Sequence, residues 1–402
     1  MKQTHRKKMT NKLDSDVRVC HFVGLSGVGG VQRNFSEYMK LEIISGNEYK
    51  HTIYTLGRVD DQYQFSTNIL NILELRNLVS LIFDLISKSK IVHFYNNLTS
   101  LKVAIFLFFI PVTNLIVHER GSAWNLPSKR DFILRFIVWK SDLILANSMA
   151  TKALLEKKFG ISKNKIKVIH NGVNTSISFK KKSLENEETF FIGFIGRLDT
   201  PKGIHVLISA MHNLKHENIK LIIAGDGPLR QELVNRVRNL KSVQFVGRVS
   251  DPYDFFNTIS LLVVPSIREP LGNVCIEAGL YRVPVLASYI DGIPEIIDNY
   301  VSGELIKPTQ SVLASDVANS IPVPEYVVNP INHELIQPMQ IDSSELADKI
   351  LLLSKNPNKL SQYANKLHKN IINCFSIEHY RKNLNNVYLD MVNSHHKRTT
   401  SN

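Results

Sequence analysis

The chain has 402 residues, more than one hydrophobic core usually supports, so we expect two domains. Hydrophobic residues make up 44% of it and charged residues 21%, as in an ordinary soluble globular protein, and three widely separated cysteines disfavour a disulfide framework or a cysteine-bound metal. The formal net charge of +13 favours acidic partners, namely phosphorylated substrates, anionic membranes or nucleic acid.

The amino-terminal tail, residues 1–16, is polar and mostly basic. No apolar core of a secretory signal follows it. The longest apolar run, Val103 to Val117, is interrupted by Pro111 and is too short for a membrane-spanning helix. We therefore expect a cytoplasmic protein.

Residues 17–173 alternate short apolar runs with helical patterns. Apolar runs rich in β-branched residues are typical of strands buried on both faces of a parallel sheet. In chain order, the expected strands are 17–25, 51–56, 90–96, 114–119, 142–148 and 166–172, with clear helical stretches at 31–42 and 150–160. This alternation predicts a Rossmann-like, doubly wound α/β domain.

A polar segment, residues 174–188, is the expected linker to a second domain of the same kind at 189–375. Its expected strands are 190–196, 219–225, 243–247, 260–266 and 283–288. We further expect a loop-rich insertion at about 308–340, and a carboxyl-terminal helix with a polar tail at 376–402 that crosses back to the first domain. Ligands of open α/β sheets bind at the carboxyl ends of the strands, so the predicted site is the interdomain cleft.

A glycine-rich loop follows the first strand of each predicted domain. The first loop, Gly24 to Arg33, does not fit the G-x-G-x-x-G fingerprint, which disfavours a dehydrogenase. The alternative to a ligand-binding role is a tight strand-to-helix turn with a structural role only. The second loop, Gly196 to Gly203, carries Arg197 and Lys202. These two cations could neutralise a diphosphate, or they could simply be solvated.

Two acids flank a predicted helix start in the second domain. The apolar run Ile259 to Ser266 predicts a buried strand, and the pattern turns helical after Gly272. A strand, a tight loop and a helix N-terminus form an anion site. Glu269 lies in this loop, and Glu277 falls on the helix face about one turn after Asn273. Carboxylates accept hydrogen bonds from hydroxyls, so the predicted ligand carries phosphate in the middle and polyols at both ends.

Together these segments resemble the retaining glycosyltransferases of family 4, which have the GT-B fold of two Rossmann-like domains around a cleft. The most specific likeness is the E-x7-E pair formed by Glu269 and Glu277. The supporting segments, in order, are GGVQR (29–33), HERGS (118–122), ILANS (144–148), VIHNGVN (168–174), GRLDTPKG (196–203) and AGDGP (224–228). The sequence PLGNV after Glu269 lacks the aromatic residue that many relatives carry after the proline.

The resemblance implies a role for each matching residue on the donor side. Arg197 and Lys202 would clamp the diphosphate, beside Gly196, and Glu277 would bind the ribose. Glu269 would hold sugar hydroxyls near the reacting carbon. The remaining residues around the donor sugar and phosphate would be Gly272, Asn273 and Val274.

On the amino-terminal side, Gly29 and Gly30 resemble the loop that approaches the diphosphate when the cleft closes. His118 resembles a histidine that contacts the donor sugar or the acceptor. A histidine at a strand end can equally be a structural hydrogen-bond partner.

The resemblance implies transfer of a sugar from a UDP- or GDP-sugar to a bacterial surface polysaccharide or a lipid-linked oligosaccharide, with retention of configuration. No cofactor and no metal ion are expected, because cations and a helix N-terminus can stabilise the leaving diphosphate. A nucleotide-sugar epimerase of similar fold is the alternative. Nucleic-acid binding rests on net charge alone, and no binding motif supports it.

The segment Ser128 to Ser141 combines cations with a broad apolar face. This pattern is typical of an interfacial helix, which predicts peripheral attachment to the anionic inner face of the plasma membrane, aided by the basic tail. A core-facing helix with solvated cations has the same pattern, because every helix that covers a sheet is amphipathic.

Overall fold

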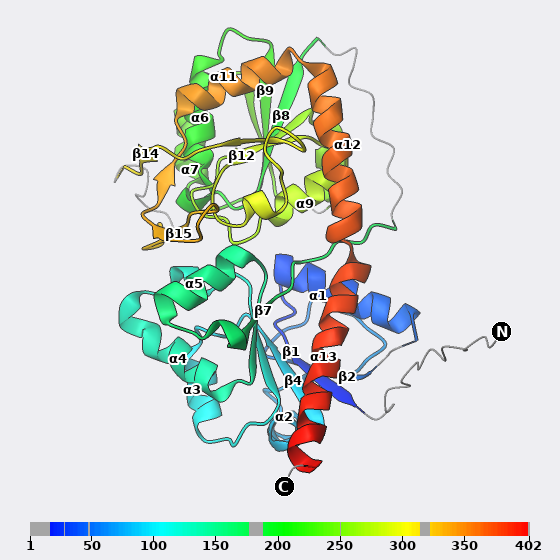
Figure 1. Cartoon of the computed structure of the whole chain (residues 1–402). Coiled ribbons are helices and arrows are strands. Elements are labelled where there is room, and N and C mark those ends of the chain that lie inside the picture. Colours follow the sequence, from blue (N-terminus) through cyan, green and yellow to red (C-terminus); the bar gives the residue numbers. More distant parts are fainter. Residues whose placement is uncertain are drawn as a thin grey trace, which may run out of the picture.

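The computed structural model describes residues 17–27, 29–46, 49–176, 188–249, 251–313 and 322–400, the last seven of them for the backbone only. The predicted tail 1–16 and most of the predicted linker 174–188 lie outside this range. Figure 1 shows two α/β halves, each built around its own sheet.

Seven parallel strands form the sheet of the amino-terminal half, in the order β3-β2-β1-β4-β5-β6-β7. The strands are β1 (Arg18–Phe22), β2 (Lys50–Thr55), β3 (Ile69–Asn71), β4 (Lys90–Tyr95), β5 (Leu115–Glu119), β6 (Leu143–Ala146) and β7 (Ile166–Val168). In the register, His21 lies beside His93, and Tyr95 lies beside His118. The central strands are buried on both faces, as their continuous apolar runs predict.

Helices cover both faces of this sheet. They are α1 (Gly30–Ile44), α2 (Leu75–Ile86), α3 (Leu101–Phe108), α4 (Asp131–Lys140) and α5 (Met149–Phe159), with 3-10 turns η1 (Asp61–Tyr63), η2 (Ala123–Asn125), η3 (Ser128–Arg130) and η4 (Lys163–Lys165). Helices α2 to α5 share one core with Phe22 and Val117, whereas α1 packs on the opposite face, with Val19 and Ile116.

Six parallel strands form the second sheet, in the order β10-β9-β8-β11-β12-β13. They are β8 (Phe190–Ile195), β9 (Ile219–Ala224), β10 (Val243–Gly247), β11 (Leu261–Val264), β12 (Val285–Ser288) and β13 (Glu304–Ile306). The helical segments are η5 (Thr200–Lys202), α6 (Ile204–Asn213), α7 (Arg230–Arg236), α8 (Pro252–Thr258), α9 (Asn273–Leu280), η6 (Ile293–Glu295), α11 (Ser343–Ser354) and α12 (Pro357–Cys374). Two doubly wound parallel sheets confirm the predicted fold class.

Between β13 and α11 the chain makes the excursion predicted at 308–340. It contains two short antiparallel ladders, β14 (Gln310–Ser311) with β17 (Met339–Gln340), and β15 (Val327–Val328) with β16 (Leu335–Ile336). Residues 314–321 lie outside the described range.

The last helix, α13 (Ile377–Thr400), returns to the amino-terminal half and packs beside α1 (Figure 1). Where it begins, the Ile377 N–H donates to the Val173 carbonyl and the Val173 N–H donates to the Phe375 carbonyl, at 2.8 and 2.9 Å. The start of α13 therefore runs beside the end of the amino-terminal domain.

Candidate active site

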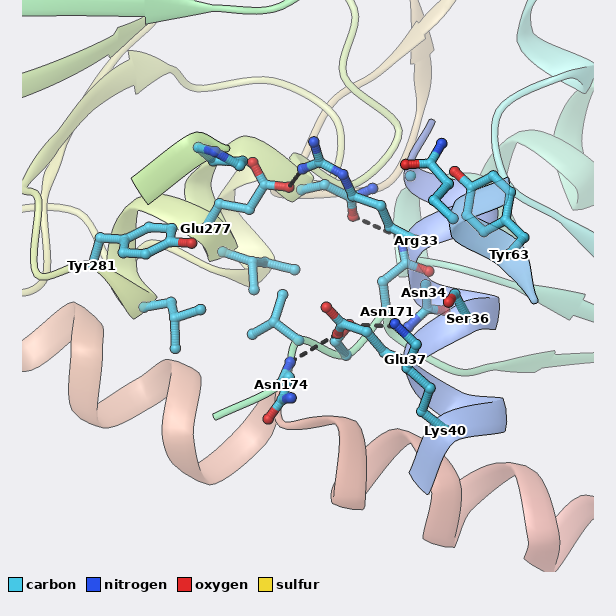
Figure 2. A pocket seen from close by; sticks show the side chains of 18 residues that line it. Arg33, Asn34, Ser36, Glu37, Lys40, Tyr63, Asn171, Asn174, Glu277 and Tyr281 are labelled. Carbon is cyan, nitrogen blue, oxygen red and sulfur yellow. Dashed lines mark hydrogen bonds and ion pairs between the residues drawn. The ribbon is translucent and has the colours of Figure 1, made fainter. Parts of the chain in front are cut away.

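A cavity of about 370 Å³ opens between the two halves, where the carboxyl ends of both sheets meet. Figure 2 shows α1 on one side and α9 on the other. The residues that line it are Gly30, Arg33, Asn34, Ser36, Glu37, Lys40, Gln62, Tyr63, Asn171, Gly172, Val173, Asn174, Pro252, Asn273, Ile276, Glu277, Leu280 and Tyr281. The structure thus brings three predicted donor residues to one cavity, Gly30 from α1 and Asn273 and Glu277 from α9.

Helix α9 begins at Asn273, directly after the loop that follows β11. Gly272 occupies its N-cap with φ +104°, a backbone conformation that L side chains rarely adopt, so glycine permits this sharp entry. The cap has no side-chain hydrogen bond and the first turn carries no acid. The N-terminus of α9, with Val274 in its first turn, is therefore available to an anion.

Glu269 lies in the loop before α9, and its carboxylate is largely buried. Its Oε2 atom accepts from Lys202 Nζ at 2.5 Å and from Ser266 Oγ at 3.3 Å. Lys202 ends the short turn η5, which follows the first strand of this domain. The structure thus joins the predicted sugar ligand and the predicted diphosphate clamp in one ion pair.

Arg197 lies on the same loop as Lys202, just after Gly196, but its side chain is 59% exposed. It is paired with Asp199, with Nε 3.2 Å from Oδ2. Burial raises the pKa of Asp199, and the neighbouring Lys202 and Arg197 oppose this effect. A guanidinium that is mostly solvated can turn toward a diphosphate at low cost.

Glu277 forms an ion pair across the cleft with Arg33 of α1, with 3.1 Å between Oε1 and Nη1. Figure 2 shows these two side chains pointing toward one another. Burial raises the pKa of Glu277, and Arg33 opposes the shift. The sequence placed Arg33 at the end of a glycine-rich loop but gave no signal that it meets Glu277.

Glu37, one turn after Arg33 on α1, is a second cavity acid that the sequence did not reveal. Burial raises its pKa to about 7, although its Oε2 atom accepts from the Asn174 N–H at 2.8 Å (Figure 2). Neighbouring Glu277 raises it further. At neutral pH this carboxyl can therefore either accept or donate a proton.

One glycine of the first loop, Gly30, lies against the second domain. Gly29 is the N-cap of α1, and a Cβ atom on Gly30 would lie 2.3 Å from Asn273 Nδ2, so glycine allows this close approach. Asn273 Oδ1 accepts from Asn171 Nδ2 at 2.6 Å. Asn171 in turn accepts from the buried Arg120, so amide contacts connect the two halves at the back of the cavity.

His118 lies at the end of β5 and is fully buried. Its ring stacks on His93, with centroids 5.5 Å apart, and burial holds its pKa well below the usual value. The structure places it among core side chains and not on the cavity wall, so contact between His118 and a substrate stays a prediction.

Among the residues described, no group of three or more histidine, cysteine, aspartate or glutamate side chains is arranged to hold a metal ion. In the same part of the chain, no helix has both the length and the apolar character needed to cross a bilayer.

Two family matches cover adjacent parts of the chain. Residues 50–177 match the family described as Glycosyltransferase Family 4, and residues 176–321 match Glycosyl transferases group 1. The two matches meet at residues 176–177, in the segment between β7 and β8.

Among curated proteins, the chain is similar to a capsular polysaccharide biosynthesis glycosyltransferase of Staphylococcus aureus (33% identity, covering 35% of this chain and 41% of the relative). It is also similar to an N-acetylgalactosaminyltransferase of Campylobacter jejuni whose name specifies a diphospho-undecaprenol acceptor (30% identity, 41% and 46% covered). The chain spans about half the length of the curated relatives it matches.

Among solved structures, the Anabaena protein HepE in complex with UDP and glucose superposes with a TM-score of 0.70 at 17% identity, over 93% of this chain and 99% of that one. At this identity the likeness shows the fold alone.

Proposed function

The chain belongs to the family 4 glycosyltransferases with the GT-B fold, and from this membership we propose that it moves a sugar from a nucleoside diphosphate donor to a polysaccharide or lipid-linked oligosaccharide acceptor. We propose further that the sugar keeps its anomeric configuration. The observation that carries the proposal is the arrangement of Glu269, Lys202 and Glu277 around the N-terminus of α9.

Each part of this arrangement suits one part of such a donor. The N-terminus of α9, together with Lys202 and Arg197, would stabilise the charge that grows on the leaving diphosphate. Glu277 would accept from ribose hydroxyls, and Glu269 from sugar hydroxyls. In a reaction with retention, the acceptor hydroxyl would approach from the face that the diphosphate leaves, and a diphosphate oxygen would take its proton. These cations and backbone N–H groups would make a divalent metal unnecessary.

A screen of nucleotide sugars by thermal shift tests the donor, because a ligand that binds only the folded state raises Tm. UDP-sugars come first, since the Anabaena structure is a complex with UDP and glucose. The stabilising donor is then assayed for release of nucleoside diphosphate with and without an oligosaccharide acceptor. Release that requires the acceptor supports transfer, whereas conversion of the donor sugar without an acceptor would indicate an epimerase.

The acceptor is proposed to lie at an anionic membrane surface, on the cytoplasmic side. Helices α3 and α4 expose an aromatic patch in which Phe108 contacts Phe109 and Phe136, and Phe136 contacts Trp139. Lys140 lies over the Trp139 ring, 5.5 Å from its centroid. The exposed fractions are 65% for Phe108, 78% for Phe109, 62% for Phe132 and 71% for Trp139. Exposed aromatic rings beside lysines suit an anionic bilayer interface.

Co-sedimentation with vesicles tests this surface. We expect binding to phosphatidylglycerol vesicles that weakens as salt rises, and that weakens further in the double variant Phe109→Ser/Trp139→Ser. Leu352→Ser, at an exposed leucine of the other domain, is the matched control. Equal recovery with neutral vesicles, or none with anionic vesicles at low salt, would reject the membrane surface.

A further inference from the structure

The excursion between β13 and α11 reaches across to the amino-terminal domain. Its strand β15 is fully buried at Val327 and Val328, and it packs with β16 against helix α5 of the other domain. These valines share a core with Ala153 and Leu154 of α5. A segment of the second domain is therefore part of the apolar packing of the first.

Ion pairs hold the carboxyl-terminal end of α5. Glu325 Oε2 lies 3.0 Å from Lys158 Nζ and accepts from Ser128 Oγ at 2.6 Å. The Ser128 hydroxyl and Lys158 together hold the pKa of Glu325 down, at about 2. Lys157 pairs with Glu334, which lies beside β16. The lysines at this end of α5 therefore meet two acids of the excursion.

The second domain also holds the amino-terminal end of α5. Glu295 accepts from the Met149 and Ala150 N–H groups at 2.8 and 3.0 Å, where a carboxylate complements the helix dipole. Ser148, the N-cap, donates its hydroxyl hydrogen to the Pro270 carbonyl at 2.5 Å. Pro270 directly follows Glu269, so both ends of α5 are bound by the domain that carries Glu269.

A single buried aspartate connects the excursion to Glu269. Asp291 Oδ1 accepts from the Val328 N–H at 2.7 Å, and Oδ2 accepts from the Glu269 N–H at 2.8 Å. The Asp291 N–H donates to the Val328 carbonyl at 3.1 Å, and the Gly292 N–H donates to the Glu269 carbonyl at 3.2 Å. The backbone of Glu269 is thus tied to strand β15 through one side chain, which is 1% exposed.

We infer that Asp291 is a positioning residue for Glu269. Residues 322–340 of the excursion, together with Glu295, form what we call the clasp, namely the contacts that bind both ends of α5. Formation of these contacts is transmitted to Glu269 through Asp291. The inference rests on the proposed function, because it takes Glu269 to hold the hydroxyls of the donor sugar near the reacting carbon. When the clasp holds α5, β15 fixes Asp291, and Asp291 fixes the backbone from which the Glu269 side chain reaches Lys202.

The geometry separates the positioning of Glu269 from the binding of the nucleoside diphosphate. Asp291 contacts the Glu269 backbone, whereas Arg197 and Glu277, the proposed diphosphate and ribose ligands, lie on another loop and on α9. Loss of Asp291 should therefore lower kcat and leave the affinity for the nucleoside diphosphate, which carries no sugar, unchanged. Replacing a residue with only a structural role would lower Tm but would not change the turnover of each folded molecule.

The first experiment replaces Asp291 by Gly and by Asn. Glycine tolerates the φ of +49° at this position and removes both acceptors, whereas asparagine keeps one. In Asp291→Gly we expect amide hydrogen exchange in the segment that contains Glu269 to rise about tenfold, kcat to fall about tenfold, and the Kd of the nucleoside diphosphate to stay within about twofold. Asp291→Asn should fall between this variant and the wild type, and it preserves the test if the glycine variant does not fold.

Matched controls use the same substitutions at Asp298, which lies on the same segment and is exposed. These variants should behave as the wild type in both measurements.

The second experiment opens the clasp with the double variant Glu325→Ala/Glu334→Ala. Both carboxylates are substantially exposed, so the fold should persist. We expect exchange at Glu269 to rise and kcat to fall about threefold, and we expect no further fall when the same pair is changed in Asp291→Gly. Glu232→Ala, which removes a surface ion pair within α7, is the control.

Wild-type exchange and kcat in Asp291→Gly, or independent effects of the clasp and Asp291, would overturn the inference. If amide hydrogen exchange at Glu269 changes as expected but the protein transfers no sugar, the link from the clasp to Glu269 is supported and the proposed function is rejected. If the protein transfers sugar but the exchange at Glu269 does not change, the proposed function is supported and the link is rejected.

Discussion

Replacing Glu277 by glutamine tests the predicted ribose contact against a competing ion pair. Glu277 is bound to Arg33 at 3.1 Å, and the two side chains are 22% and 34% exposed. We expect ribose hydroxyls to displace the guanidinium from this carboxylate. Donor affinity is therefore the difference between two interactions of the same carboxylate.

The relative sizes of these two interactions decide whether Glu277→Gln weakens or tightens donor binding. Hydrogen bonds from hydroxyls to a carboxylate contribute about 1.5 to 3 kcal/mol. A partly exposed ion pair contributes at most about 1 kcal/mol. Glu277→Gln should thus weaken donor binding by about 0.5 to 3 kcal/mol, or about twofold to 150-fold in Kd. Arg33→Gln removes only the competitor, so it should tighten Kd by up to about fivefold.

Isothermal titration with the nucleoside diphosphate of the stabilising donor measures both effects at one pH and salt concentration. The loss caused by Glu277→Gln should be larger in the Arg33→Gln background, because no ion pair then offsets it. Arg238→Gln, at an exposed arginine after α7, controls for the change in net charge.

An unchanged Kd in Glu277→Gln would remove Glu277 from the ribose site. A marked loss of affinity in Arg33→Gln would show that Arg33 binds the donor and does not compete with it.

Three further predictions concern chemistry, metals and pH. Glu269→Gln and Arg197→Ala should each lower kcat/KM roughly tenfold to a few hundredfold through lost charged hydrogen bonds, without a change in the circular dichroism spectrum, and near wild-type turnover would exclude that residue from the site. Activity should survive EDTA, whereas complete loss that magnesium or manganese restores would contradict the metal-independent proposal. Burial raises the pKa of Glu37 from 4.5 to about 7, so the folded state binds this proton more tightly than the unfolded state does. The free energy of unfolding should therefore fall by up to about 3 kcal/mol as the pH rises through that interval. Urea unfolding should therefore show Glu37→Gln to be the more stable protein at pH 8 but not at pH 4, and equal stabilities at both would refute this.

Local pattern was sufficient to predict most strands of both sheets and the start of α9, but not the edge strands β3 and β13. The apolar run Ile259 to Ser266 contains β11, Leu261–Val264, because β-branched residues without polar alternation suit a strand covered on both faces. The loop glycine and the change to helical periodicity located the helix start at Asn273. Both signals depend on residues that are neighbours in the chain.

Contacts between distant segments could not be predicted in this way. Arg33 and Glu277 are 244 residues apart, and nothing near either one indicates that α1 and α9 face each other. His118 ends a strand that could be buried on either face, and nothing near it in the sequence indicated that its side chain would be fully buried and stacked on His93. The prolines of the excursion predicted loops, but not that Val327 and Val328 would be buried against another domain.

The return of α13 has a consequence for how the protein is made. The core of the amino-terminal domain includes Leu384, Val387 and Tyr388, which the ribosome adds only after the whole second domain. Domains usually fold in the order in which they emerge. We therefore expect the nascent first domain to keep the α1 face of its sheet partly uncovered until α13 has been made, so that its folding is completed at the end of synthesis. A chain truncated before residue 377 would therefore be damaged in the domain farthest from the missing residues in the sequence.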